Sequence, residues 1–207
     1  MSVPQSLRSN ASKLSPEISK ERWRNIKLVC CDVDGTLTDG SLCFDESGQL
    51  LQTYFVRDGF ALVAARRAGL LVAWISGRAS KVAEKRFAEL GLNPELCLLD
   101  CSDKATAITN IQQRYSLTSD KCCFIGDDIP DLAGYSVCGI RVAVADAVPV
   151  VAERANYITQ HPGGRGAVRE VIDNILEAQG YYNKLLSMYE LAAQGAVDDE
   201  ASDDMQR

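Results

Sequence analysis

The stretch Lys27-Leu-Val-Cys-Cys-Asp-Val-Asp-Gly-Thr-Leu-Thr-Asp-Gly40 determines how the rest of the chain is interpreted. Its apolar run, residues 28–31, predicts a short buried strand that ends at Asp32 and Asp34. Because side chains two residues apart on a strand face the same way, the two carboxylates should point to one spot. Neighbouring carboxylates repel each other, so the pair predicts a cation or a proton that compensates them. The alternative is a polar strand end followed by a turn at Gly35.

Length and composition are those of one globular domain. The chain has 207 residues, of which 46% are apolar and 24% charged, the balance of a soluble protein that can bury a core. The net charge of −6 and the lack of a basic stripe argue against a nucleic-acid partner. No apolar run approaches the roughly 18 residues of a membrane span, so no membrane association is expected.

The two ends of the chain differ in composition from its middle. Residues 1–21 are polar and rich in serine, without the apolar run of a secretory signal. We therefore expect a flexible segment over residues 1–24, a globular domain over residues 25–180 and a C-terminal extension over residues 181–207. Beyond Gly195 the extension is acidic and poor in apolar residues, which predicts disorder.

Eight cysteines and a single histidine, His161, limit the metal chemistry of the chain. No Cys-x-x-Cys occurs, so the usual zinc spacings are absent. Several cysteines stand inside apolar, strand-like runs, where cysteine acts as a small hydrophobic residue. In the absence of a secretory signal, reduced thiols and a cytoplasmic location are expected.

Apolar strands alternate with helices along most of the chain. Strands are predicted at 28–31, 70–75, 96–99, 122–125, 139–144 and 156–158. Helices are predicted from an N-cap at Asp58 to residue 68, at 79–90, from an N-cap at Ser102 to residue 115, at 148–152 and at 167–178. This alternation predicts an α/β fold, a Rossmann-like three-layer α/β/α arrangement with a mostly parallel sheet.

Residues 41–56 predict a β-hairpin flap between the first strand and the first long helix, with a turn at 45–48. Neither this interval nor residues 100–104 has room for a large cap domain. The hairpin carries more apolar surface than an isolated hairpin exposes to water, at Leu42, Phe44, Leu50, Tyr54 and Val56. It is therefore expected to pack against something, and another subunit is one candidate.

Ligands of parallel sheets gather beyond the C-terminal ends of the strands. The polar residues at those ends are Asp32, Asp34, Ser76, Lys104, Asp127 and Asp128. Four carboxylates favour Mg²⁺, a hard cation that prefers oxygen ligands. An ammonium and a hydroxyl suit a phosphate. A carboxylate beside a phosphoryl group is a nucleophile, and a second carboxyl two residues on can donate and then accept the proton. The residues predict phosphate-ester hydrolysis through an aspartyl-phosphate.

The motifs Asp32-Val-Asp34-Gly-Thr36, Ser76, Lys104 and Gly126-Asp-Asp-x-x-Asp131 resemble the four motifs of the haloacid dehalogenase superfamily, in the right order. The resemblance implies that Asp32 is the nucleophile and Asp34 the general acid and base. It further implies that Mg²⁺ binds the side chains of Asp32 and Asp127 and the backbone carbonyl of Asp34, with Asp128 supporting it through water. Asp131 either orients Lys104 or is simply an acidic residue at a helix N-terminus.

A narrower resemblance covers residues 26–180. The segments that carry it are Asp32–Gly40, Val56-Arg-Asp-Gly59, Ser76-Gly-Arg78, residues 142–147 and Gly163-Gly-Arg-Gly-Ala-Val-Arg-Glu170. They are similar to those of the capless 3-deoxy-D-manno-octulosonate 8-phosphate phosphatase family. That family implies a homotetramer in which the hairpins assemble and a neighbour's Gly-rich segment closes the site. The alternative for residues 163–166 is a helix-capping loop.

Substrate contacts carry over from this family only where residues match. The matching residues are Asp34, Arg57, Asp58, Gly59, Arg78, Arg86, Lys104, Gly164 and Arg165; the charged side chains among them could also be solvated surface residues. One departure is Val63, where the family can carry an arginine. The loss of that cation puts the identity of the sugar acid in question, although Arg66 or Arg67 could compensate for it.

The function that the resemblance implies is Mg²⁺-dependent hydrolysis of a sugar-acid phosphate, namely 3-deoxy-D-manno-octulosonate 8-phosphate, in lipopolysaccharide precursor synthesis. One alternative is a nonulosonate 9-phosphate phosphatase or a broader sugar phosphatase. A receiver-like signalling domain also stores phosphate on an aspartate, but its phosphoacceptor lies on a later strand. An inactive scaffold is disfavoured because every motif residue is present.

Overall fold

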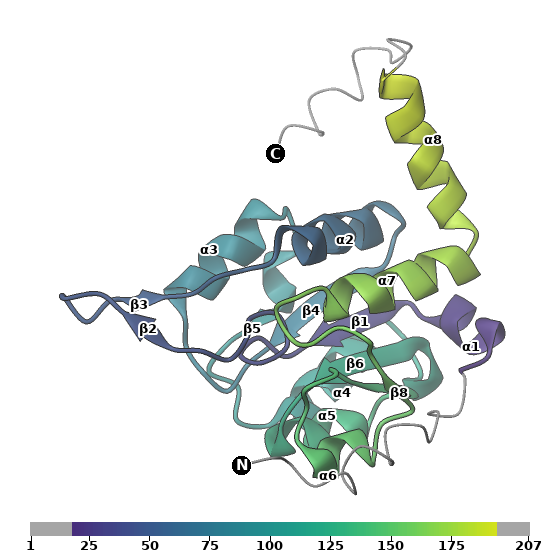
Figure 1. The fold of residues 1–207 in the computed structure, drawn as a ribbon. Coiled ribbons are helices and arrows are strands. Elements are labelled where there is room, and N and C mark those ends of the chain that lie inside the picture. Colours follow the sequence, from purple (N-terminus) through teal and green to yellow (C-terminus); the bar gives the residue numbers. More distant parts are fainter. Residues whose placement is uncertain (1–17, 194–207) are drawn as a thin grey trace, which may run out of the picture.

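A computed structural model describes residues 18–193 and shows one central sheet between two layers of helices (Figure 1). The sheet has six strands in the order β5-β4-β1-β6-β7-β8, and every pair is parallel. The strands are β1 Leu28–Cys31, β4 Leu71–Ile75, β5 Cys97–Leu98, β6 Cys122–Gly126, β7 Ile140–Ala143 and β8 Tyr157–Ile158. The predicted α/β architecture with a parallel sheet is confirmed, and no large cap domain interrupts residues 18–193.

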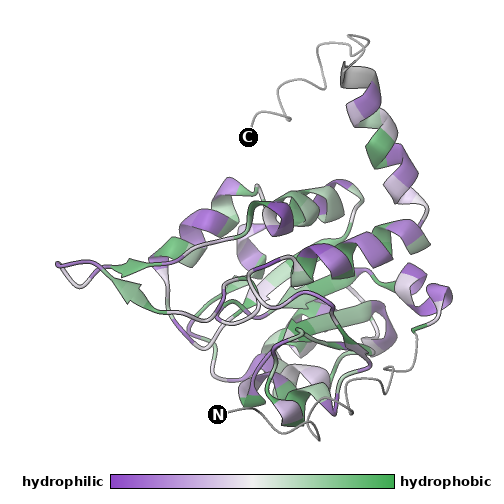
Figure 2. Ribbon diagram, viewed as in Figure 1, coloured by the Kyte–Doolittle hydropathy of each residue, from purple (hydrophilic) through white to green (hydrophobic). Residues whose placement is uncertain are grey.

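Strand β1 is central, and this explains its composition. All four of its residues are buried, because both neighbouring strands and both helical layers cover it. Leu28 is in register with Leu71 of β4 and with Cys122 of β6. Cysteines in β1 and β6 serve as small core residues, and hydrophobic residues follow the central strands in Figure 2. The C-terminal ends of β1, β4 and β6 therefore lie side by side.

Helices α2, α3 and α7 cover one face of the sheet, and α4 and α5 cover the other (Figure 1). The helices are α1 Lys20–Asn25, α2 Val56–Arg67, α3 Lys81–Glu89, α4 Lys104–Arg114, α5 Leu132–Tyr135, α6 Pro149–Ala152, α7 Ala167–Ala178 and α8 Tyr181–Ala193. Short 3₁₀ helices occupy Pro94–Leu96, Ser119–Lys121 and Ile129–Asp131. None of the helices within residues 18–193 combines the length and the apolar character needed to cross a membrane.

Two predicted helix caps are wrong. Helix α2 begins at Val56, so Asp58 lies inside its first turn and does not cap it. Helix α4 is capped by Asp103 and not by Ser102, since the Asp103 side chain accepts a hydrogen bond from the amide of Thr106 at 3.0 Å. The observed N-cap lies three residues before Asp58 in α2 and one residue after Ser102 in α4. For Asp58 the difference matters, because the residue is then not a cap of its own helix.

The two ends of the described chain pack against the domain. We expected residues 1–24 to be flexible, but Ile18 and Trp23 are buried. The Trp23 ring lies edge-on to Tyr157, with 5.6 Å between ring centroids, and Arg24 Nε donates to the carbonyl of Ala178 at 3.0 Å. The folded domain therefore includes residues 18–24. Helix α8 packs through Tyr189 on Phe60 of α2, and the acidic tail beyond Gly195 lies outside the described residues.

The predicted hairpin is present as a separate two-stranded unit of β2 Cys43–Phe44 and β3 Leu50–Leu51. The Asp45 carboxylate closes its turn by accepting the amides of Ser47 and Gln49. Hydrophobic residues occur along its arms (Figure 2), and the side chains of Phe44 and Leu51 are exposed by 59% and 51%. The excess apolar surface predicted for the hairpin therefore persists in the single chain.

Candidate active site

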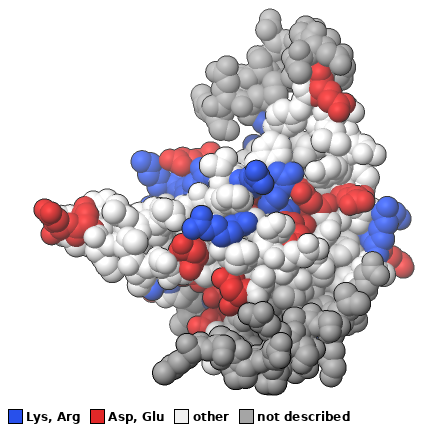
Figure 3. All heavy atoms as spheres, in the orientation of Figure 1, with Lys and Arg blue, Asp and Glu red and all other residues white. Residues whose placement is uncertain are grey.

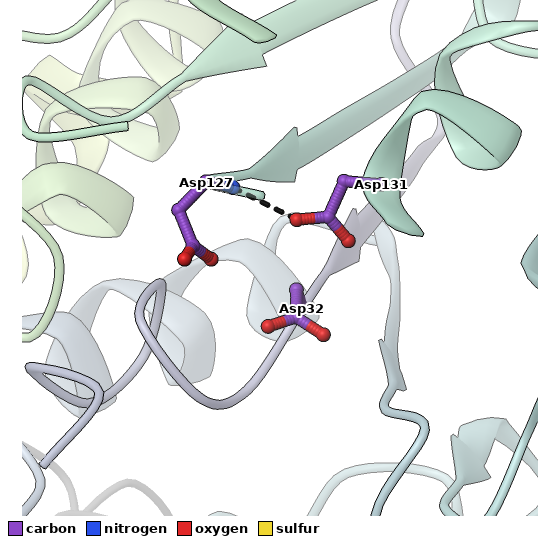
Figure 4. A group of neighbouring side chains, drawn as sticks. All are labelled: Asp32, Asp127 and Asp131. Carbon is purple, nitrogen blue, oxygen red and sulfur yellow. Dashed lines mark hydrogen bonds between the residues drawn. The ribbon is translucent and has the colours of Figure 1, made fainter. Parts of the chain in front are cut away.

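Three carboxylates meet beyond the ends of β1 and β6. Asp32 follows β1, Asp127 follows β6, and Asp131 comes from the 3₁₀ turn after it. One oxygen from each of them lies within 4.8 Å of the others, and Figure 4 shows the three side chains converging on one point. The sheet order makes β1 and β6 neighbours, so Asp32 and Asp127, which are 95 positions apart in the chain, share this point.

Lys104, the first residue of α4, inserts its ammonium into this group. Its Nζ donates to Asp32 Oδ1 at 2.5 Å and to Asp131 Oδ1 at 2.6 Å. The other oxygen of Asp131 accepts the amides of Asp127 and Asp128 at 2.8 and 3.1 Å. Asp131 therefore orients Lys104 and caps the turn after β6 at once, so the two interpretations of this residue are both correct.

Burial makes negative charge expensive at this point. Asp32 is only 7% exposed, and burial, with the charge of Asp131, raises its pKa to about 7 against the opposing effect of Lys104. Burial and Asp131 likewise raise the pKa of Asp127 to about 7. Burial lowers the pKa of Lys104, but the carboxylates of Asp32 and Asp131 outweigh it, so its net direction is upward. One ammonium does not balance three carboxylates, and the group suits a further cation.

The donor set fits a hard divalent cation. Carboxylate oxygens are the ligands that Mg²⁺ prefers in proteins. Asp131 has both oxygens engaged by Lys104 and by backbone amides, which leaves Asp32 and Asp127 as the side chains suited to hold the ion. Asp34 and Asp128 line the same cavity but lie outside the group of three. Asp128 is exposed, and its Oδ1 accepts the amide of Ile129 at 2.7 Å.

Cation affinity should fall as the pH falls through neutrality. Asp32 and Asp127 must lose their protons to bind a cation, and the pKa of each is raised to about 7. We expect Mg²⁺ to bind at least about tenfold more weakly near pH 6 than near pH 8, as measured by calorimetric titration. Asp127→Asn should flatten this dependence. If the Mg²⁺ affinity of the unmodified protein were the same at pH 6 and pH 8, this prediction would be contradicted.

Gly35 allows Asp127 to approach the loop after β1. Its φ is +94°, and a Cβ placed on it would lie 2.1 Å from Asp127 Oδ2. The Thr36 hydroxyl donates to Asp127 Oδ1 at 3.0 Å, so this loop also orients the carboxylate. The glycine is therefore required both by the backbone and by a side chain of the site.

Comparison of two glycine substitutions should separate the effect of the positive φ from the effect of the contact with Asp127. Gly35→Ala should displace Asp127 and weaken Mg²⁺ binding by about tenfold or more, besides costing about 1 kcal/mol of stability. Gly48→Ala is the matched control, because Gly48 has a similar φ of +79° but no atom within 4 Å of the position that a Cβ would take. Thermal unfolding measures the stability of each variant, and calorimetric titration measures its Mg²⁺ affinity. Equal Mg²⁺ affinity in the two variants would contradict the steric argument.

An open cavity of about 810 Å³ surrounds this cluster. It brings together Asp32, Asp34, Ser76, Arg78, Lys104, Asp127 and Asp128 from the predicted residues. Ser76 follows β4 and is buried, and its Oγ accepts the amide of Arg78 at 3.1 Å. Arg78 in turn donates from Nε to Asp34 Oδ2 at 3.2 Å. The predicted phosphate-handling residues thus line one space.

The other predicted substrate contacts lie elsewhere in the single chain. Gly59 and Arg86 line a second cavity of about 630 Å³, between α2, α3 and α8. Arg57 and Arg165 line a third, of about 440 Å³, at the start of α7. Neither cavity shares a lining residue with the one around Asp32. These matches do not form one substrate site with Lys104 within one copy of the chain.

Asp58, one of the predicted substrate contacts, binds the start of another helix in the structure. It is buried, and its two oxygens accept the amides of Gly166 at 3.2 Å and Arg169 at 2.7 Å. Gly166 is the N-cap residue of α7 and has no side chain to cap it, so a carboxylate from α2 does so. Burial raises the pKa of Asp58, and the two amides counteract this.

Gly163 and Gly164 pack against their own chain. The Gly164 amide donates to the carbonyl of Thr36 at 2.9 Å. A Cβ on Gly163 would lie 1.7 Å from the carbonyl oxygen of Gly35. The family resemblance implied that this Gly-rich segment closes a neighbour's site. In the structure these two glycines cover the loop after β1 of the same chain, and closure of a neighbour's site stays a prediction.

Sequence reasoning missed Gln52, which contacts a predicted catalytic residue. Its Nε2 donates to Asp34 Oδ1 at 2.8 Å. Gln52 lies just past β3, and a glutamine in a β-prone run gives no signal of a site. Thr36 stands inside the first of the four motifs, but the motif alone does not predict its bond to Asp127.

Fold, acidic cluster and lysine together define a haloacid dehalogenase-like hydrolase, and residues 98–172 match the model of such a family. The 3-deoxy-D-manno-octulosonate 8-phosphate phosphatase KdsC of Haemophilus influenzae is 38% identical over 161 residues, which cover 78% of this chain and 88% of that protein. The chain belongs to the family of 3-deoxy-D-manno-octulosonate 8-phosphate phosphatases, in agreement with its motifs.

Solved structures of similar proteins share the fold. A 3-deoxy-D-manno-octulosonate 8-phosphate phosphatase from Moraxella catarrhalis, in complex with magnesium, phosphate and KDO, superimposes with a TM-score of 0.78 at 32% identity, covering 82% of this chain and 97% of that one. A Xanthomonas campestris protein described as hypothetical gives a TM-score of 0.79 at 37% identity, covering 91% and 99%.

Proposed function

We propose that this chain is a Mg²⁺-dependent phosphatase that hydrolyses 3-deoxy-D-manno-octulosonate 8-phosphate to the free sugar acid and phosphate, for lipopolysaccharide precursor synthesis. The observation that carries the proposal is the contact of Lys104 with Asp32 and Asp131 beside Asp127. A carboxylate suited to act as the nucleophile, an ammonium suited to bind phosphate and carboxylates suited to bind a metal line one cavity, which supports the proposal. Family membership supports the substrate.

The residues divide the reaction between them. Asp32 attacks phosphorus, and as the P–O bond to the sugar breaks, the bridging oxygen takes a proton from Asp34. The product is an aspartyl-phosphate on Asp32. Asp34 then removes a proton from the water that attacks this phosphorus, which releases phosphate and restores Asp32. Lys104 and the Ser76 hydroxyl hold phosphate oxygens throughout. Bound to Asp32 and Asp127, Mg²⁺ would supply charge neutralisation between carboxylates and phosphate.

Arginine side chains near Val63 are relevant to which sugar acid the enzyme prefers. Val63 removes one arginine that the family can carry, but Arg67 and Arg86 line the same cavity as Val63. Cationic side chains therefore remain beside Val63, but this cavity shares no lining residue with the one around Asp32, so the support for the eight-carbon acid is family membership. A nonulosonate 9-phosphate is the second candidate, because Val63 stands where the octulosonate phosphatases can carry an arginine.

A substrate panel tests the proposal. We expect kcat/KM on the eight-carbon sugar-acid phosphate to exceed that on a nine-carbon one and on simple hexose phosphates by about tenfold or more. Phosphate release is measured with Mg²⁺ present and after its chelation. A higher kcat/KM on the nine-carbon ester would establish the second candidate. A phosphoryl-enzyme that persists for minutes without turnover would favour the receiver-like alternative.

We also propose that the chain assembles into a homotetramer in the cytoplasm. The exposed apolar arms of the hairpin support assembly, with Phe44 and Leu51 more than half exposed, and Val56 at the start of α2 is 76% exposed. Apart from its acidic tip, the hairpin face in Figure 3 carries little charge. Unpaired thiols at all eight cysteines are consistent with a reducing compartment. Mass measurement in solution tests the assembly, and a fully active monomer would refute it.

A further inference from the structure

The proposed acid and base, Asp34, is not held by the lysine of the site. Its Oδ1 accepts a hydrogen bond from Gln52 Nε2 at 2.8 Å, and its Oδ2 accepts one from Arg78 Nε at 3.2 Å. Arg78 is a long side chain that is 43% exposed, whereas Gln52 is half-buried. The shorter bond comes from the more restricted side chain, so Gln52 is the better candidate for fixing Asp34.

Neighbouring groups fix the orientation of the Gln52 amide. Ser80 Oγ, the N-cap of α3, accepts the amide of Ala83 at 3.1 Å and donates to Gln52 Oε1 at 2.7 Å. The Tyr54 hydroxyl donates to the same oxygen at 3.4 Å, and the Tyr54 ring stacks on Trp74 of β4. Because a carboxylate only accepts hydrogen bonds, the NH₂ end of the amide faces Asp34, and its carbonyl oxygen accepts from the two hydroxyls.

We propose that Gln52 is a positioning residue, which holds Asp34 where it can protonate the leaving oxygen. This inference rests on the proposed phosphatase function and adds a residue to it. Gln52 stands next to β3, so the hairpin carries the group that sets the acid. The chain Ala83–Ser80–Gln52–Asp34 ties the hairpin to the start of α3 and to the end of β1.

Leaving groups of different basicity separate this role from a structural one. When the P–O bond of an alkyl phosphate breaks, the electron pair goes to a strongly basic oxygen, which needs the proton of Asp34. An aryl phosphate such as p-nitrophenyl phosphate releases a weakly basic oxygen, which leaves without that proton. Since kcat/KM reports the steps up to this cleavage, a misplaced Asp34 should slow the alkyl ester selectively.

The variants Gln52→Leu and Gln52→Glu test the proposal on three esters: the sugar-acid phosphate, glycerol phosphate and p-nitrophenyl phosphate. We expect kcat/KM to fall about 10- to 100-fold on both alkyl esters and to stay within about threefold on the aryl ester. Gln49→Leu is the matched control, because Gln49 lies on the same hairpin with an exposed side chain. It should change none of the three values.

A double-substitution cycle completes the test. In the Asp34→Asn background, Gln52→Leu should add no further loss, because the two residues act as one unit. Equal losses on all three esters would indicate a structural role and overturn the proposal. A loss on the sugar acid alone would mean that Gln52 contacts the substrate, which also overturns it. Failure of the unmodified enzyme to hydrolyse any phosphate ester would instead refute the proposed function itself.

Discussion

Asp32→Asn is expected to lower phosphatase turnover by roughly 10⁴- to 10⁶-fold, the loss seen when an enzyme loses its covalent nucleophile. An amide cannot form the acyl-phosphate, and the substitution also removes one of the proposed ligands of the cation. The fold should survive, because asparagine has the same shape and removes a buried charge whose pKa is already raised. Turnover is measured by phosphate release, and the covalent intermediate by acid-quenched phosphoryl labelling of the protein.

The control for Asp32→Asn is Asp120→Asn, the same chemical change at an exposed residue of the short helix Ser119–Lys121. It should retain full turnover and full labelling. Circular dichroism and thermal unfolding should match between the two variants. If Asp32→Asn kept near-normal hydrolysis, or if the phosphoryl label appeared on another residue, the assignment of the nucleophile would be lost.

Removal of Mg²⁺ is expected to reduce turnover by about a thousandfold or more, which corresponds to the several kcal/mol that a cation contributes at a phosphoryl centre. Three carboxylates gather within 4.8 Å, and without a cation they repel an anionic substrate. Chelation followed by return of Mg²⁺ should abolish and then restore activity. At a concentration a hundredfold above its dissociation constant, Mg²⁺ should stabilise the fold by about 2.7 kcal/mol.

The variant Asp127→Asn distinguishes stabilisation by Mg²⁺ bound at this site from a general effect of salt on stability. In this variant Mg²⁺ should raise the unfolding temperature little, because one of the two available carboxylates is gone. Asp120→Asn should respond as the unmodified protein does. A wild-type unfolding temperature that does not change with Mg²⁺, together with activity that survives chelation, would show that the acidic cluster works without a cation.

The central strands, and the polar residues that follow their C-terminal ends, were predictable because short stretches of sequence specify them. The run at residues 28–31 is apolar and short, and it forms the fully buried β1. The parallel order then places Asp32, Ser76, Lys104 and Asp127 around one cavity. Helix α7 was predicted with its observed bounds, Ala167–Ala178, since its apolar face repeats with helical spacing.

Contacts between distant segments were not predictable in the same way. Asp58 was interpreted as the cap of its own helix, but it caps α7, which begins more than a hundred positions later. Trp23 lies in a polar stretch, yet its ring is buried against Tyr157. Gln52 gives no local signal for its bond to Asp34. In each case the partner is chosen by tertiary packing, which local periodicity does not encode.

The cover that Gly163 and Gly164 place on the loop after β1 has a consequence for protein synthesis. The proposed nucleophile, Asp32, is synthesised early, but the backbone that covers the loop after it comes from residues 163 and 164. A nascent chain that has released only β1, β4 and β6 from the ribosome holds the three carboxylates without that cover. Competence for catalysis should therefore arise late in translation, after the start of α7 has emerged and Asp58 has engaged it.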